Sequence, residues 1–268
     1  MIQDFISTVI DPAIIPNFEK KAMKLLIMKF TLVFTLFTVH CSLFINPAMS
    51  QQNAKYVKTE VKKGKFLEST FLLYLPEGYV KKDPKQWPLV LFLHGAGERG
   101  DFIELVKKNG PPMMIEEGKS FPFIVVSPQC PEEQRWSVDV LDMLLNHLAE
   151  EYNVDEKCIF VTGLSMGGAG TWDLAMAFPK RFAAIAPVCG RADVSQAEKI
   201  RDLPVWVFHG AKDDIVPFSE AENIVNALKA MGSPVKFTLY PEANHDSWTE
   251  TYNNPELWDW MLQQCKQR

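Results

Sequence analysis

The chain has 268 residues, of which 47% are hydrophobic and 23% charged, and its formal net charge is −5 with a sequence pI near 5.6. This composition is typical of a globular protein. The acidic balance excludes a basic surface of the kind that binds nucleic acid or an anionic membrane without sequence-specific contacts.

The first 50 residues are predicted to be an N-terminal extension and a secretory signal peptide. Three lysines precede a mostly apolar run over 30–45, and a small-x-small pattern formed by Ala48 and Ser50 follows it. This order predicts export to the periplasm or the cell exterior, with cleavage after Ser50. Because a signal peptide normally begins the chain and 22 residues precede this one, we expect Met23 to be the true start.

Two other interpretations of this segment are weaker. An uncleaved membrane anchor is disfavoured because the apolar run is short for a membrane span and contains His40. A lipid anchor at Cys41 is disfavoured because residues 38–40 match a lipoprotein site poorly. We therefore expect no stable membrane partner.

Residues 51–268 are predicted to form a single α/β domain. Strand-like runs over 56–61, 66–67 and 70–75 predict an N-terminal antiparallel hairpin. Further along, runs that are apolar throughout, as in strands covered on both faces, alternate with amphipathic segments; the runs are 88–93, 121–127, 158–161, 182–188, 205–208 and 235–240, and the helical segments are 137–152, 169–178, 219–231 and 255–266. The alternation predicts a mostly parallel central sheet with helices on both faces.

Four cysteines follow the expected cleavage site: Cys130, Cys158, Cys189 and Cys265. Their spacing does not resemble a metal site, and we expect neither a metal nor another cofactor. Small buried hydrophobic residues are the default interpretation. Export would permit a disulfide, with Cys130 as a candidate, but the sequence leaves its connectivity open.

The most informative stretch is Gly-Leu-Ser-Met-Gly-Gly at 163–168, which follows a predicted strand and precedes a predicted helix. Taken alone, Gly-x-Ser-x-Gly is also compatible with an ordinary turn of small residues. Between a strand and a helix it is typical of a nucleophile elbow, which projects a serine from the end of a sheet. Ser165 is therefore the candidate nucleophile.

A serine nucleophile needs a base, usually a histidine held by a carboxylate. If the three residues follow one another along the chain in the order Ser, Asp, His, the base is His245, which follows the last predicted strand. The other downstream histidine, His209, ends a strand whose following loop supplies the acid instead, as Asp213 or Asp214. Spacing alone leaves these two aspartates open.

An oxyanion hole requires two backbone N–H groups near the nucleophile. One is expected from Met166, directly after Ser165. The second is expected from the glycine-rich loop at 94–100, at Ala96 or, failing that, at Gly95. In the same loop we expect His94 to brace the backbone, and the charges of Glu98 and Arg99 to be solvated.

Several phrases together resemble one branch of the α/β-hydrolase superfamily: those at 94–100, 127–130, 163–168 and 209–217, and His245 with Trp248. This branch contains phospholipase/carboxylesterase-type esterases, dienelactone hydrolase and the "predicted peptidase" esterases. The resemblance covers nearly all of residues 51–268 and implies an α/β-hydrolase fold. In the family phrase at 209–217 the first aspartate is the triad acid, which implies Asp213 rather than Asp214.

The resemblance implies a serine esterase that forms an acyl-enzyme on Ser165, and the predicted signal peptide implies that this esterase is exported. The expected partner is a small-molecule or carbohydrate ester. Its family includes enzymes for acetyl or feruloyl esters of plant polysaccharides. Trp136 and Trp248 are candidate substrate-binding residues, although both are also compatible with a core role. Alternatives are a peptidase or thioesterase on the same triad, or a non-catalytic carbohydrate-binding scaffold. Acyl specificity and oligomeric state stay open.

Overall fold

The computed structural model describes residues 51–62 and 65–265, which belong to one compact unit, Ser50–Arg268. The predicted signal peptide, its cleavage site and the start at Met23 lie outside the described residues. Within the described part, no helix combines the length and apolar character needed to cross a membrane.

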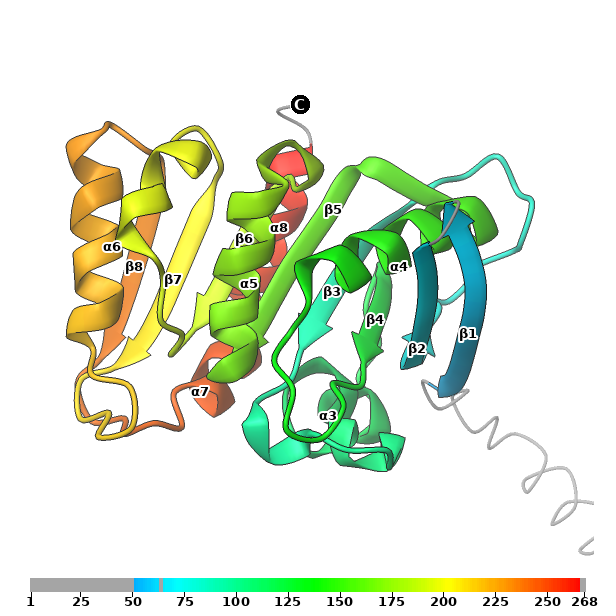
Figure 1. Cartoon of the computed structure of the whole chain (residues 1–268), viewed down its shortest axis with the longest axis horizontal. Coiled ribbons are helices and arrows are strands. Elements are labelled where there is room, and N and C mark those ends of the chain that lie inside the picture. Colours follow the sequence, from blue (N-terminus) through cyan, green and yellow to red (C-terminus); the bar gives the residue numbers. More distant parts are fainter. Residues whose placement is uncertain (1–50, 63–64, 266–268) are drawn as a thin grey trace, which may run out of the picture. The chain divides into compact units, whose positions relative to one another are not determined.

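The centre of this unit is an eight-stranded sheet in the order β1-β2-β4-β3-β5-β6-β7-β8 (Figure 1). Its strands are β1 Gln52–Lys62, β2 Lys65–Tyr74, β3 Trp87–Leu93, β4 Ile124–Pro128, β5 Val154–Leu164, β6 Ala184–Val188, β7 Val205–Gly210 and β8 Val235–Tyr240. β1 pairs antiparallel with β2, and β2 antiparallel with β4, while every pairing from β4 to β8 is parallel. The predicted mostly parallel sheet with an N-terminal hairpin is confirmed, and the fold is that of the α/β-hydrolases.

Helices cover both faces of the sheet, and each face has its own hydrophobic core. The first core lies under α4 Val138–Glu151, α5 Met166–Ala177 and α6 Ser219–Ala230; the second lies under α3 Gly110–Glu116, α7 Trp248–Asn253 and α8 Pro255–Cys265. Figure 1 shows α4, α5 and α6 in front of the strands and α8 behind them.

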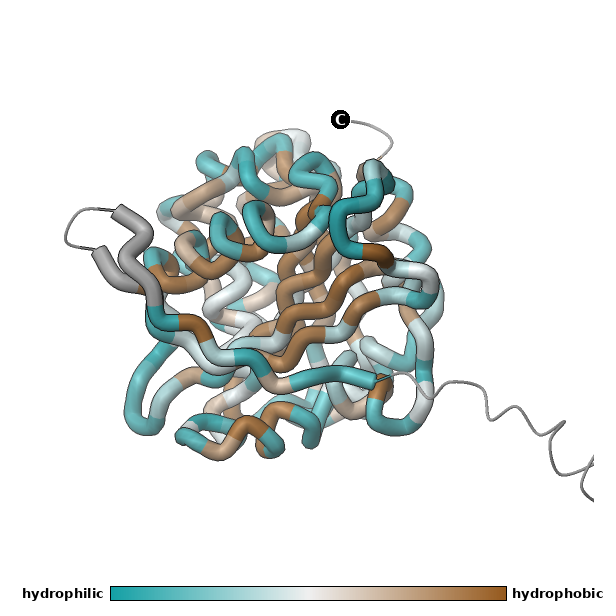
Figure 2. The backbone as a smooth tube through the Cα atoms, turned by 90° about the vertical axis from the view of Figure 1, so that its right-hand side faces the viewer, coloured by the Kyte–Doolittle hydropathy of each residue, from teal (hydrophilic) through white to brown (hydrophobic). Residues whose placement is uncertain are grey.

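β3 illustrates why a buried strand is apolar at every position. Leu89 and Leu91 belong to the first core, whereas Val90 and Phe92 belong to the second. Successive side chains of a strand point to opposite faces, so both sets are buried when helices lie on both sides. Figure 2 shows the result as a central band of hydrophobic strands inside a more hydrophilic surface.

The cysteines depart from expectation. Cys158 of β5 and Cys265 of α8 form a disulfide, with their Cα atoms 5.0 Å apart, because α8 packs directly on the face of the sheet that carries Cys158. Cys130 and Cys189 are free and buried. The suggestion that Cys130 pairs is therefore wrong, and the default of unpaired cysteines holds only for two of the four.

Two helices were not predicted. α3 begins Gly110-Pro111-Pro112, a sequence typical of a turn, but proline is tolerated in the first helical turn, where its missing N–H would have no partner. α7 has only six residues, too few to show a helical period.

Candidate active site

The backbone at Ser165 makes the sharp turn expected of a nucleophile elbow. β5 ends at Leu164 and α5 begins at Met166, and Ser165 between them has φ 53° and ψ −113°. Positive φ is uncommon for a residue with a side chain, and such backbone persists only where its surroundings hold it. The Ser165 N–H donates to the Val188 carbonyl of β6 at 3.0 Å, which ties the turn to the neighbouring strand.

The glycines of the elbow allow its close packing. A Cβ on Gly167 would lie 1.9 Å from the Leu93 carbonyl oxygen, and one on Gly168 would lie 2.4 Å from that of Val188. Any side chain at these positions would therefore push the first turn of α5 away from β3 and β6. The glycines keep Ser165 at the carboxyl ends of the central strands.

Three predicted side chains meet at this edge of the sheet. His245 Nδ1 lies 2.8 Å from Asp213 Oδ2, and its Nε2 lies 2.9 Å from Ser165 Oγ. Because a carboxylate only accepts hydrogen bonds, Nδ1 carries the proton that is donated to Asp213. Nε2 is then free to accept the hydroxyl proton of Ser165, as a general base must.

Asp213 is fixed on its other side as well. Its Oδ1 accepts hydrogen bonds from the backbone N–H groups of Ile215 at 2.9 Å and Val216 at 2.8 Å. Asp213 is buried, whereas Asp214 is exposed. Asp213 is therefore the aspartate that reaches His245, and its loop holds the carboxylate in one orientation.

A second histidine contacts the same carboxylate, and sequence reasoning gave it no role. The fully buried His209 places Nε2 2.8 Å from the Val216 carbonyl oxygen and 3.1 Å from Asp213 Oδ2. Since both neighbours are acceptors, Nε2 carries a proton and donates. His209 thus fastens the start and the end of the acid loop together; its position at the end of a strand, four residues before Asp213, was the available signal.

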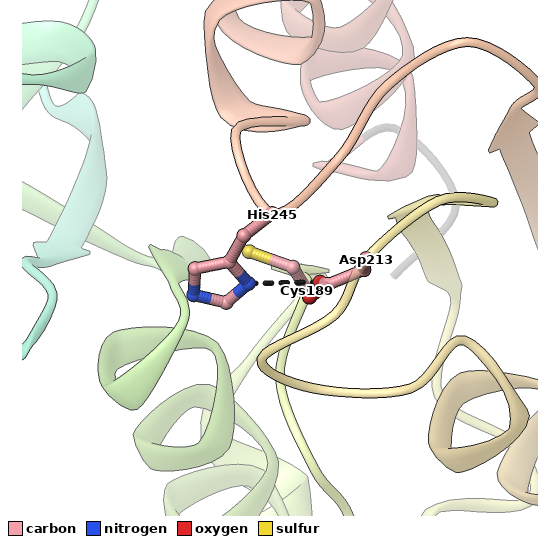
Figure 3. A group of neighbouring side chains, drawn as sticks. All are labelled: Cys189, Asp213 and His245. Atoms are coloured by element: carbon pink, nitrogen blue, oxygen red, sulfur yellow. Dashed lines mark hydrogen bonds and ion pairs between the residues drawn. The ribbon is translucent and has the colours of Figure 1, made fainter.

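Cys189 lies next to Asp213 and His245. Figure 3 shows its sulfur beside the pair formed by His245 and Asp213, and one ligand atom from each of the three lies within 4.8 Å of the others. Such a group could hold a metal ion. However, burial raises the pKa of the Cys189 thiol to about 12, and a metal would compete with the hydrogen bond between His245 and Asp213. The arrangement is better suited to orienting His245 than to binding a cation.

The predicted oxyanion donors lie next to Ser165. Ala96 and Met166 line the same cavity, of about 460 Å³, as Ser165. Ala96 begins the short helix η1 Ala96–Glu98 and Met166 begins α5, and N–H groups at the start of a helix have no acceptor within it. Both groups are thus available to an oxyanion formed at Ser165.

His94 braces this loop, as predicted. Its Nδ1 lies 2.7 Å from the Gly95 carbonyl oxygen, and its Nε2 accepts from the Cys130 N–H at 3.0 Å. Burial lowers the pKa of His94 to about 4, so the ring is neutral at pH 7. It joins the loop after β3 to the loop after β4.

The expectation of a solvated Glu98 is wrong. Glu98 is buried, because Asn109 Nδ2 donates to its Oε1 at 2.9 Å and supplies a partner inside the protein. Asn109 Oδ1 in turn accepts from Trp248 Nε1 at 3.1 Å, and the Trp248 ring meets the His245 ring edge-on, with centroids 5.5 Å apart. The oxyanion loop and the base are therefore linked through side chains. Arg99 also has protein partners, the carbonyl oxygens of residues 96 and 134.

The two candidate tryptophans of the substrate site occupy different places. Trp248 packs on His245, as just described. Trp136 donates from Nε1 to the His94 carbonyl oxygen at 3.2 Å and lines a neighbouring cavity. The residues lining the cavity at Ser165 include neither tryptophan.

Comparisons with known proteins find a family that part of the chain resembles. Residues 126–256 match the sequence profile described as "Dienelactone hydrolase family". The matched stretch contains Ser165, Asp213 and His245, the three side chains that meet at the sheet edge.

Several relatives of this chain are named as esterases. A bifunctional acetylxylan esterase/xylanase of Neocallimastix patriciarum is 26% identical over 52% of this chain and 21% of its own length. A probable feruloyl esterase C of Aspergillus flavus is 24% identical over 62% of this chain and 63% of its own. A thermostable esterase of known structure is 33% identical with a TM-score of 0.67, over 79% of this chain and 62% of its own. The chain thus spans less than two thirds of each of these relatives.

Proposed function

We propose that the protein is a carboxylic ester hydrolase that works through a serine acyl-enzyme. The observation that carries this proposal is the unbroken series of short contacts from Asp213 through His245 to Ser165. The esterases among its relatives and the match to the dienelactone hydrolase family support it.

In the first half of the reaction Ser165 Oγ attacks the ester carbonyl while His245 Nε2 takes its proton. The imidazolium that forms is stabilised by Asp213, whose position the backbone of its own loop fixes. The carbonyl oxygen becomes negative and is bound by the N–H groups of Ala96 and Met166. His245 then gives the proton to the departing alcohol.

In the second half water attacks the acyl-enzyme with His245 again as base, and the acid is released. His245 transfers every proton in this cycle, and water is the second reactant. The acyl groups we propose are acetyl or feruloyl groups carried by plant polysaccharides, which the similarity to an acetylxylan esterase/xylanase and to a probable feruloyl esterase supports.

Hydrolysis of p-nitrophenyl acetate tests the chemistry. Wild-type protein should release nitrophenolate, and Ser165→Ala should lower kcat by about 10⁴-fold or more. Ser219→Ala is the matched control, because Ser219 is exposed at the start of α6 and lines none of the cavities described here. A wild type without activity on any nitrophenyl, methyl feruloyl or acetylated xylan ester would overturn the proposal, and so would equal activity in the two serine variants.

We also propose that the protein is exported and loses residues 1–50. Besides the sequence pattern, the disulfide between Cys158 and Cys265 supports this, because disulfides persist mainly in oxidising compartments. The N-terminal sequence of protein recovered from the periplasm or medium should begin at Gln51. Full-length protein confined to the cytoplasm would contradict export.

A further inference from the structure

A second cavity adjoins the one at Ser165. Its volume is about 340 Å³, within the range of small-molecule sites. It lies between the hairpin of β1 and β2, the segment after η1, and the loop that leads into α4. Arg135 forms part of the wall of both cavities, and Arg99 of the first is followed directly by Gly100 of the second. The two cavities therefore share a wall at Arg135.

Two aromatic rings with fixed positions line this second cavity. Tyr56 is 60% exposed, yet its hydroxyl donates to Glu68 Oε1 at 2.8 Å, and Lys58 holds the same carboxylate at 3.0 Å. Trp136 is fixed by its bond to the backbone of residue 94. An exposed ring held in place by its hydroxyl is suited to stacking against the flat face of a ligand.

The polar groups around these rings include both donors and acceptors. Glu68 and Asp101 present carboxylates, which accept hydrogen bonds, whereas Gln134 and Arg135 present N–H groups, which donate them. A sugar hydroxyl both donates and accepts, so a mixed set of this kind matches a polyhydroxylated ring. Lys58 neutralises Glu68, and the single charges of Asp101 and Arg135 are opposite, so the wall has no net charge and is better matched to a neutral ligand than to an ion.

We propose that this cavity is a subsite for a neutral sugar ring, adjacent to the unit that carries the ester. This inference rests on the proposed esterase function and extends it. The preferred substrate is an ester on an oligosaccharide, whose next sugar lies beyond Arg135 on Tyr56, rather than an ester on a single sugar or a small alcohol.

The test compares substrates with the same acyl group and different alcohols. The probes are acetylated xylo- and cello-oligosaccharides, the corresponding acetylated monosaccharides, and p-nitrophenyl acetate. In the wild type, kcat/KM for at least one oligosaccharide should exceed that for its monosaccharide. In Tyr56→Ala this preference should fall about tenfold, as expected for the loss of one stacked ring. In Gln134→Ala it should fall by about fivefold, as expected for the loss of one hydrogen bond. Hydrolysis of nitrophenyl acetate should be unchanged in both variants.

Phe102→Ala is the matched control for Tyr56→Ala. Phe102 is 63% exposed and lines neither cavity, so its loss should leave all three substrate classes unchanged. Both variants that carry the test alter exposed side chains, so folding should survive.

The two possible failures are distinguishable. A wild type that cleaves nitrophenyl acetate but shows no oligosaccharide preference would overturn the subsite alone. An equal loss on all three substrates in Tyr56→Ala, or no loss on any, would do the same. A wild type inactive on every ester would overturn the proposed function, and the subsite with it.

Discussion

The surroundings of Ser165 and the cavity lined by Tyr56, which share a wall at Arg135, differ in how deeply their functional side chains are buried. Around Ser165 the reacting groups follow buried strands, and short hydrogen bonds fix them on several sides; Asp213 is only 8% exposed. The neighbouring cavity is built from an edge strand and an exposed loop, and its Tyr56 is 60% exposed. The contrast teaches that groups whose chemistry depends on exact geometry are held in the interior, while groups that select the substrate can lie on the surface.

Asp213→Asn should give the largest effect, because it alters a buried group whose geometry the reaction needs. An asparagine can present its amide to His245 and favour the wrong imidazole tautomer, so kcat on nitrophenyl acetate should fall by about 10⁴-fold. Asp214→Asn is the matched control at the adjacent, exposed position, and it should retain wild-type kcat. Similar losses in both variants would contradict the assignment of the acid.

The disulfide joins α8 to β5, the strand that leads to Ser165. It closes a loop with a sequence separation of 107 residues, so removing it in Cys158→Ser/Cys265→Ser should lower the free energy of unfolding by about 4 kcal/mol. Urea denaturation measures the loss, and a reducing agent should lower the stability of the wild type but leave the double variant unchanged. Sensitivity of the double variant to reductant would show that another thiol is involved.

His94 joins the two regions, and its burial predicts a dependence of stability on pH. Its folded pKa is lowered from 6.5 to about 4, so the unfolded chain binds a proton at a higher pH than the folded one. Stability contributed by neutral His94 is therefore present above pH 6.5 and lost as the pH falls towards 4, by about 3 kcal/mol. Denaturation at pH 7 and pH 4 should show this loss in the wild type.

His94→Gln provides the control for that prediction, because glutamine has no ring to titrate. Whatever its stability at pH 7, the variant should lose less stability between the two pH values than the wild type, by about 3 kcal/mol. Equal pH dependence in both proteins would contradict the burial account.

His209 tests whether the buried position of Asp213 matters for catalysis, and a smaller effect on kcat is expected than for Asp213→Asn. His209→Leu removes the N–H that lies between Val216 and Asp213, and a small displacement of the acid should lower kcat by about 10- to 100-fold. His209→Gln keeps an N–H and should recover most of the lost kcat. Equal loss of kcat in the two variants would show that the residue only fills space.

The fold and the sharp turn at Ser165 could be predicted from the sequence because their signals are local. Apolar runs such as 88–93 reveal strands buried on both faces, and Gly-x-Ser-x-Gly between a strand and a helix is a constraint of one turn. α3 was missed because its prolines resemble those of a turn, and the pairing of Cys158 with Cys265 was missed because it depends on how α8 packs against the sheet.

The roles of residues that depend on partners distant in the sequence could not be predicted from the sequence. The buried Glu98 accepts from Asn109, eleven residues further along the chain, and the contacts then continue through Trp248 to His245. His209 showed a position at a strand end but no partner. Tyr56 lies in a hairpin far from Ser165 in the sequence, and only the folded sheet brings it beside Arg135.

The most direct test of the central claim is to trap the acyl-enzyme step with a fluorophosphonate probe and to locate the label by peptide mass spectrometry. The probe forms a stable bond only with a serine activated by its base. The account predicts one labelled peptide, carrying the probe on Ser165, with labelling lost in Ser165→Ala and slowed strongly in Asp213→Asn but not in Asp214→Asn. A folded wild-type protein that remains unlabelled, or a label on another residue, would contradict it.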